Sequence, residues 1–354
     1  MDWFCSGRVD SFRFVRVSLA TWRELEEVAG ITGGTLERNG QTALKASGSL
    51  DYVLAPAAGN DLVRVYSDSL DPATGERATI AHGTYLVSTP SSTFRGSVEE
   101  GTADLYSVLH VLEEDAFEAP LVLPAGTNAV ARAADIVRGA GLPAVASPSA
   151  AVLSADAVFD ERDASKLDVV NWLLDLAGFE SAGCDGYGNV LLAPYVDPAA
   201  KSPTVVLHDD EGACVYRSGV VREYDAFDVP NVVTVTRSNA SGEPLSATAV
   251  NDDPASAFST VSRGRRIVRK ETVSDAADLA ALHAKARSLL AAKTAAVEGF
   301  EVTHAFLPFE MGAVCDFAYR KAGIARDDLM AVRQTMKLRP GMECTTRFLR
   351  FARR

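Results

Sequence analysis

The chain has 354 residues, of which 47% are hydrophobic, and its 35 lysines and arginines against 47 aspartates and glutamates give a formal net charge of −12. This length predicts two or three domains at about 150 residues each, and the composition allows a sizeable core. No run of about 18 apolar residues occurs, so we expect no membrane insertion, and the start shows no signal-peptide pattern. The five cysteines are scattered, which favours reduced, mostly buried thiols and a cytoplasmic origin.

The charge is unevenly distributed along the chain. Residues 1–258 contain 17 basic and 37 acidic side chains, a net of −20, whereas residues 259–354 contain 18 basic and 10 acidic ones, a net of +8. Such a division predicts charge complementarity within one chain or between copies. It argues against non-specific DNA binding by most of the protein. The alternative is that solvated faces simply differ in charge.

Residues 1–120 show the pattern of short antiparallel strands. Asn39-Gly40 is a strong hairpin signal, and residues 44–52 after it alternate between apolar or small and polar side chains. The extended stretches LVRVYSD and ATIAHGTYLVST are separated by the turn-rich SLDPATGER. We expect a small barrel or sandwich here.

Residues 121–205 change to a mixed pattern. Thr127 or Asn128 is placed to cap a helix that ends at residues 139–141, and Ser165 is placed to cap a second helix, with Asp168 three residues later. The apolar positions of each helix form a stripe, namely Val130, Ala134 and Val137 in the first and Leu167, Val170, Leu174 and Ala177 in the second. The segment predicts a small α+β insert that ends in a hairpin.

That hairpin contains CDGYGNVLLAPYVDP, residues 184–198, which has some features of a binding loop. A calcium loop needs glycine at its sixth position and glutamate at its twelfth, and counted from Asp185 these positions are Val190 and Val196. The dinucleotide pattern fails as well, because Leu191 stands where the third glycine is required and no helix follows. We therefore interpret the stretch as a tight turn.

Residues 206–354 return to extended patterns, with one helix expected at about 275–297, capped by Ser274, and four strands after it. The sequence thus predicts a mainly β chain with an α+β insert. Two β-barrel-like or sandwich-like domains, residues 1–120 and 206–354, flank the small α+β module of residues 121–205.

No motif for catalysis or for a cofactor is present. The five histidines are isolated, and neither H-E-x-x-H, a G-x-S-x-G elbow nor a Walker loop occurs. The densest polar cluster is HDDEG, residues 208–212, which could supply an acid or a base but is more often a solvated turn. We expect no enzyme, no metal and no cofactor. The alternatives are a cell-wall-acting hydrolase that uses Asp209 and Asp210, and a carbohydrate-binding module with exposed aromatics.

One basic cluster, RGRRIVRK, is the candidate assembly surface, formed by Arg263, Arg265, Arg266, Arg269 and Lys270. It could grip phosphates, but no aromatics accompany it in the sequence. We expect instead a strand whose basic side chains meet an acidic neighbour, for which residues 110–120, HVLEEDAFEAP, are a candidate.

Four stretches, in this order along the chain, resemble the tail hub proteins of bacteriophages and prophages. They are the opening TWRELEEVAGITGGTLERNGQTALKASGSLDYV, the helix AGTNAVARAADIVRGAGL, the helix and hairpin SKLDVVNWLLDLAGFESAGCDGYGNVLLAPYVDP, and the entry NDDPASAFSTVSRGRRIVRKE into the last β region. Each motif is weak alone. Their shared order over nearly the whole chain carries the resemblance.

The resemblance implies a structural protein of the virion tail tip, assembled in the bacterial host cytoplasm. In this family a homotrimer with two barrel-like domains per chain presents a pseudo-sixfold face to the tail tube or distal tail protein. The other side meets the tape-measure and spike or fibre proteins, and DNA passes through the ring without specific binding. An acidic majority suits a channel, because like charge keeps phosphates from adhering. The lysozyme or peptidase domain of some tail-tip proteins has no counterpart here.

Overall fold

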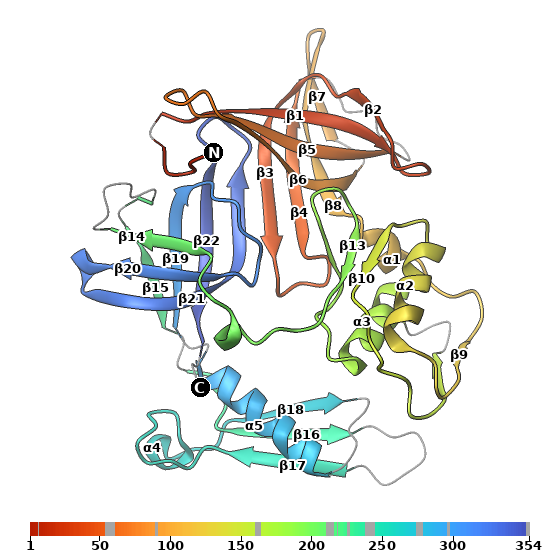
Figure 1. Ribbon diagram of the computed structural model, residues 1–354, viewed down its shortest axis with the longest axis vertical. Coiled ribbons are helices and arrows are strands. Elements are labelled where there is room, and N and C mark those ends of the chain that lie inside the picture. The colour runs from red at the N-terminus through yellow and green to blue at the C-terminus, as the bar shows by residue number, and fades with distance from the viewer. Residues whose placement is uncertain are drawn as a thin grey trace.

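The computed structural model describes residues 1–5, 7–53, 61–88, 91–159, 164–209, 216–217, 219–224, 227–237, 245–273, 279–295 and 298–351. Within these residues the chain is mainly β, and one large sheet joins strands from both ends of the sequence (Figure 1). The insert lies beside this sheet, and a smaller layer around one helix lies below both in the view of Figure 1.

The first 107 residues supply one half of the large sheet. Its antiparallel order is β3-β4-β8-β6-β5-β1-β2, with β7 paired to β8. The hairpin between β3 and β4 begins at Asn39, as the Asn-Gly signal predicted. The strands are β1 (Val9–Ser18), β2 (Glu24–Glu27), β3 (Ile31–Asn39), β4 (Ala46–Tyr52), β5 (Asp61–Leu70), β6 (Arg77–Val87), β7 (Ser91–Arg95) and β8 (Val98–Ser107).

The second half of the large sheet comes mostly from the C-terminal segment. It comprises β14 (Val205–His208), β15 (Val221–Tyr224), β19 (Glu298–Ala305), β20 (Val314–Tyr319), β21 (Ile324–Lys337) and β22 (Glu343–Arg350), with the short helix η2 (Arg320–Ala322) between β20 and β21. The four strands predicted after the long helix are therefore confirmed. The end of β21 pairs with β3, where Arg333 lies opposite Asn39 and Lys337 opposite Thr35. This seam makes the two β regions one hydrogen-bonded sheet.

The described strands form sandwich-like layers, and none of the described sheets closes into a barrel. One core lies between the strands of the first half and residues near the seam, such as Leu36, Leu50 and Met336. A second core, around Phe300 and Phe317, lies within the C-terminal strands. Of the two forms expected from the sequence, the sandwich is the one observed.

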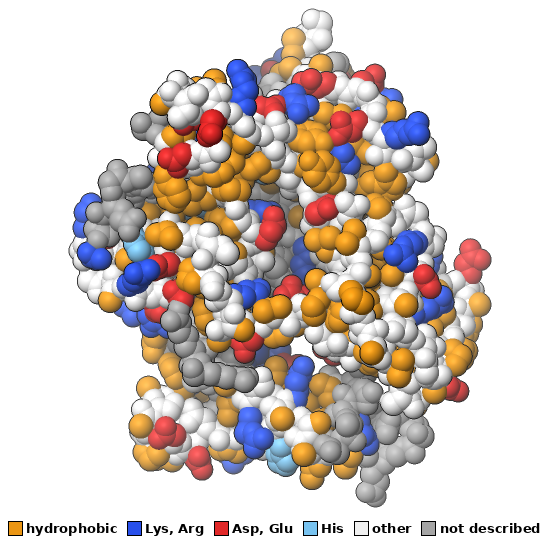
Figure 2. All heavy atoms as spheres, viewed as in Figure 1, with side chains coloured by type: hydrophobic (Ala, Val, Ile, Leu, Met, Phe, Trp, Pro, Cys, Tyr) orange, Lys and Arg blue, Asp and Glu red, His pale blue; other side chains and the backbone are white. Residues whose placement is uncertain are grey.

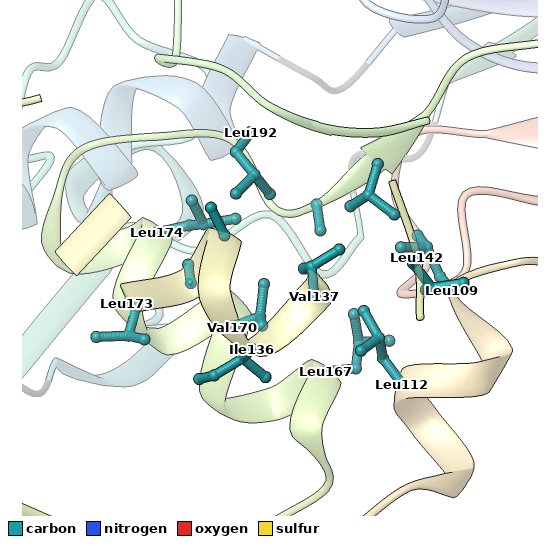
Figure 3. Close-up of a cluster of buried hydrophobic side chains, with 14 of the residues drawn as sticks. Leu109, Leu112, Ile136, Val137, Leu142, Leu167, Val170, Leu173, Leu174 and Leu192 are labelled. Atoms are coloured by element: carbon teal, nitrogen blue, oxygen red, sulfur yellow. The ribbon is translucent and has the colours of Figure 1, made fainter. Parts of the chain in front are cut away.

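The helices of the insert pack into one core (Figure 3), which Val17 of β1 and Leu62 of β5 also join. Asn128 caps α2 by accepting from the Ala131 amide, and Ser165 and Asp168 form a capping box on α3, so both predicted caps are confirmed. Leucines and valines from α1, α2 and α3 converge in Figure 3. The elements are α1 (His110–Glu114), β9 (Leu121–Leu123), α2 (Ala129–Gly139), β10 (Ala144–Ala146), β11 (Ala157–Phe159), α3 (Lys166–Leu176), β12 (Gly183–Cys184), β13 (Val190–Leu192) and η1 (Pro198–Ala200).

A separate three-stranded sheet with one long helix, here the α5 layer, lies between β15 and β19 in the sequence. It comprises β16 (Val232–Arg237), β17 (Leu245–Val250), α4 (Thr260–Arg263), β18 (Val268–Val273) and α5 (Leu279–Ala295). The helix expected at about 275–297 is thus found, and its expected cap Ser274 lies outside the described residues. None of the described helices is long and apolar enough to cross a membrane. The division into domains at residues 120 and 205 stays a prediction.

Candidate assembly surfaces

A chain of hydrogen bonds runs through the interior beside the seam. Arg38 Nη2 donates to Gln334 Oε1 at 2.6 Å, and Gln334 Nε2 donates to Thr346 Oγ1 at 3.0 Å. His304 Nδ1 lies 2.7 Å from the Ala305 carbonyl, which can only accept, so this nitrogen carries the hydrogen. His304 Nε2 is then the acceptor for the Thr346 hydroxyl at 2.8 Å. The chain ties β3, β21, β22 and β19 together.

Two histidines beside the seam, the buried His304 and the half-buried His82, are held neutral. Burial lowers the pKa of His304 to about 4 and the pKa of His82 to about 3, and the Arg38 charge adds to both effects. His82 Nε2 lies 2.7 Å from Ser67 Oγ. These histidines fit the joined halves in the unprotonated form, because burial disfavours the charged imidazolium.

One side of the large sheet is mostly hydrophilic from β8 across the seam to β19. Farther along the same side, Val17, Leu62 and Leu86 pack against the insert. Paired residues on neighbouring strands share a side, and hydroxyl pairs such as Thr35–Ser49 at 3.1 Å and Thr303–Thr345 at 3.3 Å confirm it. Arg333 reaches Glu37 at 2.7 Å across the seam. We call this hydrophilic part the polar face, formed by Thr35, Glu37, Ser47, Ser49, Asp51, Thr102, Asp104, Glu301, Thr303, Arg333, Thr335, Lys337, Glu343, Thr345 and Arg347.

The polar face has more carboxylates than cations. Its acidic side chains come from strands of both halves, and short hydroxyl side chains fill the space between them. The carboxylates are Glu37, Asp51, Asp104, Glu301 and Glu343, against the cations Arg333, Lys337 and Arg347. Such a face binds water well and offers a polyanion few sites to adhere.

The stretch at residues 185–189 is a turn, as the sequence predicted. The Asp185 carboxylate accepts from the Tyr187 amide at 2.9 Å and the Asn189 amide at 2.8 Å. Its second oxygen accepts from Asn189 Nδ2 at 2.8 Å. The turn therefore uses the oxygens that a calcium ion would need.

The same turn docks the insert on the large sheet. The Thr84 hydroxyl donates to the Gly186 carbonyl at 3.0 Å, and Arg64 Nη2 donates to the Tyr187 carbonyl at 2.9 Å. A Cβ on Gly186 would lie 2.0 Å from the Ala81 carbonyl oxygen, so only glycine permits this close approach. The glycines are visible in the sequence, but their close contact with the large sheet depends on the fold.

The basic cluster differs from its prediction, because only part of it is a strand. Ser259 caps the one-turn helix α4 by accepting from the Ser262 amide at 3.0 Å, and Gly264, at φ 62°, ends it in the left-handed region. The cluster is therefore divided among helix, loop and strand, with Arg263 at the end of α4, Arg265 and Arg266 in the loop, and Arg269 and Lys270 on β18. Its role in assembly stays a prediction.

Two arginines of the cluster lie against aromatic rings that precede the cluster in the sequence. The Arg263 guanidinium lies 5.0 Å from the centre of the Phe258 ring, and that of Arg265 lies 4.8 Å from the Phe227 ring. Phe227 is 71% exposed and Tyr224 is 59% exposed. Arginine beside exposed aromatics is typical of interface hot spots, and no periodicity could have revealed this pairing.

The described part of the HDDEG cluster serves the fold. Both Asp209 oxygens accept from the backbone N–H groups of residues 320 and 321, at 2.9 and 3.0 Å, and these bonds hold its pKa below the usual range. His208 is buried and lies 3.0 Å from Asp316 Oδ1. Residues 210–212 lie outside the described residues. The described residues contain no group of three His, Cys, Asp or Glu side chains that could hold a metal.

The acidic segment proposed as counterpart of the basic cluster makes its polar contacts nearby. His110 lies 2.8 Å from Glu113 and 3.2 Å from Glu114, and Asp115 pairs with Lys166. On the face shown in Figure 2, acidic and basic side chains are interspersed. Contact between this segment and the basic cluster of another copy stays a prediction.

Comparison with known proteins gives a clear result for the fold alone. No family model and no curated protein matches the sequence. The structure is similar to a tail protein from Neisseria meningitidis MC58, with a TM-score of 0.67 and 13% identity over 96% of both chains. It is also similar to the 43 kDa tail protein of prophage MuSo2 from Shewanella oneidensis, with a TM-score of 0.66 and 10% identity over 96% of this chain and 98% of that one.

A third similar structure is the prophage tail protein gp18 from Listeria monocytogenes EGD-e, with a TM-score of 0.52 and 12% identity over 95% of this chain and 94% of that one. All three likenesses extend over nearly the full length of both chains, so they include the large sheet, the insert and the α5 layer together. The resemblance expected from the sequence is therefore confirmed in three dimensions. The chain has the fold of the phage and prophage tail proteins.

Proposed function

We propose that this chain is a non-enzymatic hub of a phage or prophage tail, a homotrimer that joins the tail tube to the tip complex around the DNA channel. The polar face is the observation that carries the proposal. It extends over strands of both halves without interruption, as one wall of a channel would. The shared fold with tail proteins makes a tail role the natural setting.

Electrostatics support the polar face as a channel wall. DNA carries about one negative charge per 1.7 Å of its axis, and surface cations bind it by releasing counterions. The cations of the polar face are partly neutralised, since Arg333 pairs with Glu37 and Lys337 with Glu343. The remaining carboxylates and hydroxyls would let DNA pass without specific binding.

The proposal places the tail tube or distal tail protein on one side of the ring and the tape-measure and spike or fibre proteins on the other. The arginine–aromatic surface at Arg263, Arg265, Phe227 and Tyr224 would then contact such a partner or another copy. The location would be the virion tail tip, reached by assembly in the host cytoplasm.

Light scattering at low and moderate salt tests the oligomeric state first. We expect a trimer, and negative-stain electron micrographs of the same sample should show rings with a central opening. A monomer at high concentration, with no ring even in the presence of a tail tube partner, would contradict the proposal.

The channel wall is tested separately by its charge. Replacing Glu301, Asp51 and Asp104 with lysine should leave the trimer intact and produce salt-sensitive DNA retention, measured by a filter-binding assay. The matched control introduces three lysines on the insert, at the exposed positions Asp135, Asp175 and Glu180. Equal retention by both variants would show that the polar face is not the surface that DNA meets.

A further inference from the structure

A hairpin projects from one end of the large sheet, at the top of Figure 1. It consists of β7 and the beginning of β8, joined by the two-residue turn Gly96-Ser97. Strand β4 pairs with β8 only from Gly101 onward and β6 only from Leu105 onward, so among the described strands the tip is held by its own ladder alone. Every residue from 92 to 98 is exposed. We call residues 92–100 the finger.

One face of the finger combines an aromatic ring with a carboxylate. Phe94 lies directly opposite Glu99, and opposite residues of an antiparallel ladder share a side, with Cβ atoms about 5 Å apart. Phe94 is 70% exposed. On the other face Arg95 pairs with Glu100 at 3.3 Å, whereas Glu99 has no ion pair within the described part of the chain. This face therefore offers a partner an apolar side chain beside an unpaired negative charge.

The outer edge of the finger also has backbone groups available. In a hairpin with a two-residue turn, the pair that flanks the turn, here Arg95 and Val98, exchanges hydrogen bonds. Bonding alternates along the strand, so Thr93 bonds to β8 whereas Phe94 directs its N–H and C=O groups away from β8. No described strand pairs with this edge of β7. An unpaired edge is a template for a strand from another chain.

The α5 layer, at the other end of the molecule in Figure 1, has a helix that lies away from the middle of its sheet. The strand order is β17-β16-β18, so β16 is central. The buried side chains Leu282, Ala286 and Leu290 of α5 nevertheless share their core with valines of β16 and alanines of the edge strand β17. From β18 only Val273 joins, and it is partly buried. A helix in this place would be centred if a fourth strand lay beside β17.

The ladder of β17 determines how a fourth strand can pair. The Asn251 amide donates to the Asn231 carbonyl at 2.8 Å, so Ala249 bonds β16 whereas Thr248 and Val250 direct their N–H and C=O groups outward. No described strand pairs with that edge. A parallel strand would bond the Thr248 carbonyl and the Val250 amide through one residue placed beside Ala249. The side chain of that residue would share the side of Ala249, which faces α5.

A groove of about 630 Å³ lies between this edge and α5. Ala249, Leu290 and Ala291 belong to its apolar lining, and His283 and Arg287, one helical turn apart, stand on its helical side. Arg287 is exposed and has no ion pair among the described residues. The groove thus combines an unpaired backbone edge, an apolar lining and an unpaired cation.

We propose that the finger of a second copy occupies this groove and adds β7 to β17 as a parallel fourth strand. Phe94 then lies beside Ala249 beneath α5. Its N–H donates to the Thr248 carbonyl, and its C=O accepts from the Val250 amide. The exposed ring of the finger is thereby covered by the apolar lining of the groove.

The charges of the two surfaces are complementary in this arrangement. Glu99 is on the same face as Phe94, one strand farther out, within reach of the long Arg287 side chain. The contact joins opposite ends of two copies, so it is heterologous. A heterologous contact closes a ring of three when the rotation between copies is a third of a turn. In this respect the inference rests on the proposed homotrimer.

The first test is sedimentation velocity of full-length variants over a range of concentrations. Phe94→Ser and Arg287→Glu should each raise the concentration for half-assembly at least about tenfold, as for an interface anchor and a close charge pair. The matched controls are Val98→Ser, on the opposite face of the finger, and Lys285→Glu, at an exposed position of α5 that does not line the groove. Both controls should assemble as the wild type does. All four positions are exposed, so circular dichroism should show the same fold in every variant.

Exchange of charges and mixing of variants make the test specific. Glu99→Arg alone should weaken assembly, and combining it with Arg287→Glu in one chain should restore assembly, because each contact regains a pair of opposite charges. A mixture of Phe94→Ser and Arg287→Glu chains should give a dimer where neither variant associates alone, since one intact finger and one intact groove remain. Equal loss in variants and controls, no recovery in the double variant, or a mixture that stays monomeric would each overturn the inference.

The same measurements separate this contact from the proposed function. A wild-type trimer that neither Phe94→Ser nor Arg287→Glu weakens would overturn the finger contact and leave the hub function standing. A wild-type chain that stays a monomer at high concentration would count against both.

Discussion

The buried histidine at the seam should make the joined sheet sensitive to mild acid. His304 is 1% exposed, and its pKa of about 4 lies below the ordinary value of 6.5. Between these values the unfolded chain binds a proton that the folded chain does not. Stability is therefore complete above pH 6.5 and is lost as the pH falls toward 4. Protonation would also place a second donor against the Thr346 hydroxyl, which already accepts from Gln334.

The size of the loss follows from the two pKa values. A shift of 2.5 units corresponds to about 3 kcal/mol in full, and about 2 kcal/mol of it should be lost between pH 7 and pH 5. His82, with a pKa of about 3, should add a similar loss over the same range. Urea unfolding at the two pH values, followed by tryptophan fluorescence, measures the difference, since Trp3 contacts Phe306 near the seam.

Replacing His304 measures how much of the stability loss between pH 7 and pH 5 comes from this one imidazole. His304→Gln should be less stable at pH 7 because it leaves unfilled space, but its loss between pH 7 and pH 5 should be smaller than that of the wild type by about 2 kcal/mol. His283→Gln, on exposed α5, should keep the full loss because it leaves the seam intact. If His304→Gln and the wild type lose equal stability over this range, the seam does not hold a neutral histidine.

Three further changes test how the insert is built and docked. Gly186→Ala should destabilise the chain by about 1–3 kcal/mol through its clash with the Ala81 carbonyl, whereas Gly183→Ala, whose Cβ would meet open space, should cost far less in urea unfolding. Ser165→Ala should cost about 1 kcal/mol by removing the cap of α3, with helix loss visible by circular dichroism at lower temperature. Leu173→Ala, in the core of Figure 3, should cost about 2–5 kcal/mol and lower the melting temperature.

Sequence patterns predicted the local elements well, because local chemistry decides them. The caps at Asn128 and Ser165 and the turn at Asp185 depend on side chains within a few residues of the backbone groups they satisfy. The basic stretch after Ser259 was expected to be extended throughout. Ser259 as a cap and Gly264 in the left-handed region instead bound one helical turn there. Both residues are start and stop signals of a helix, but the apolar pair Ile267 and Val268 after them favoured a strand prediction.

The arrangement of the strands could not be predicted in the same way. Pairing of β3 with β21 brings together residues almost 300 positions apart, and no local pattern in either segment names its partner. The hydrogen bonds that link Arg38 to Gln334, Gln334 to Thr346 and Thr346 to His304 cannot be seen in the sequence for the same reason. The candidate surfaces could not be predicted either, because Phe227 and Arg265 are far apart in the sequence and come into contact only in the folded chain.

The seam also changes the meaning of the charge division in the sequence. The acidic first 258 residues and the basic remainder meet inside one sheet, where Arg333 pairs with Glu37 at 2.7 Å. The pairing runs in the opposite direction too, since Arg217 of the acidic part pairs with Glu343 at 2.7 Å. Much of the expected complementarity is thus satisfied within one chain. A trimer of this chain should therefore loosen with salt only as far as its interchain charge pairs require, and less steeply than the opposed net charges would suggest.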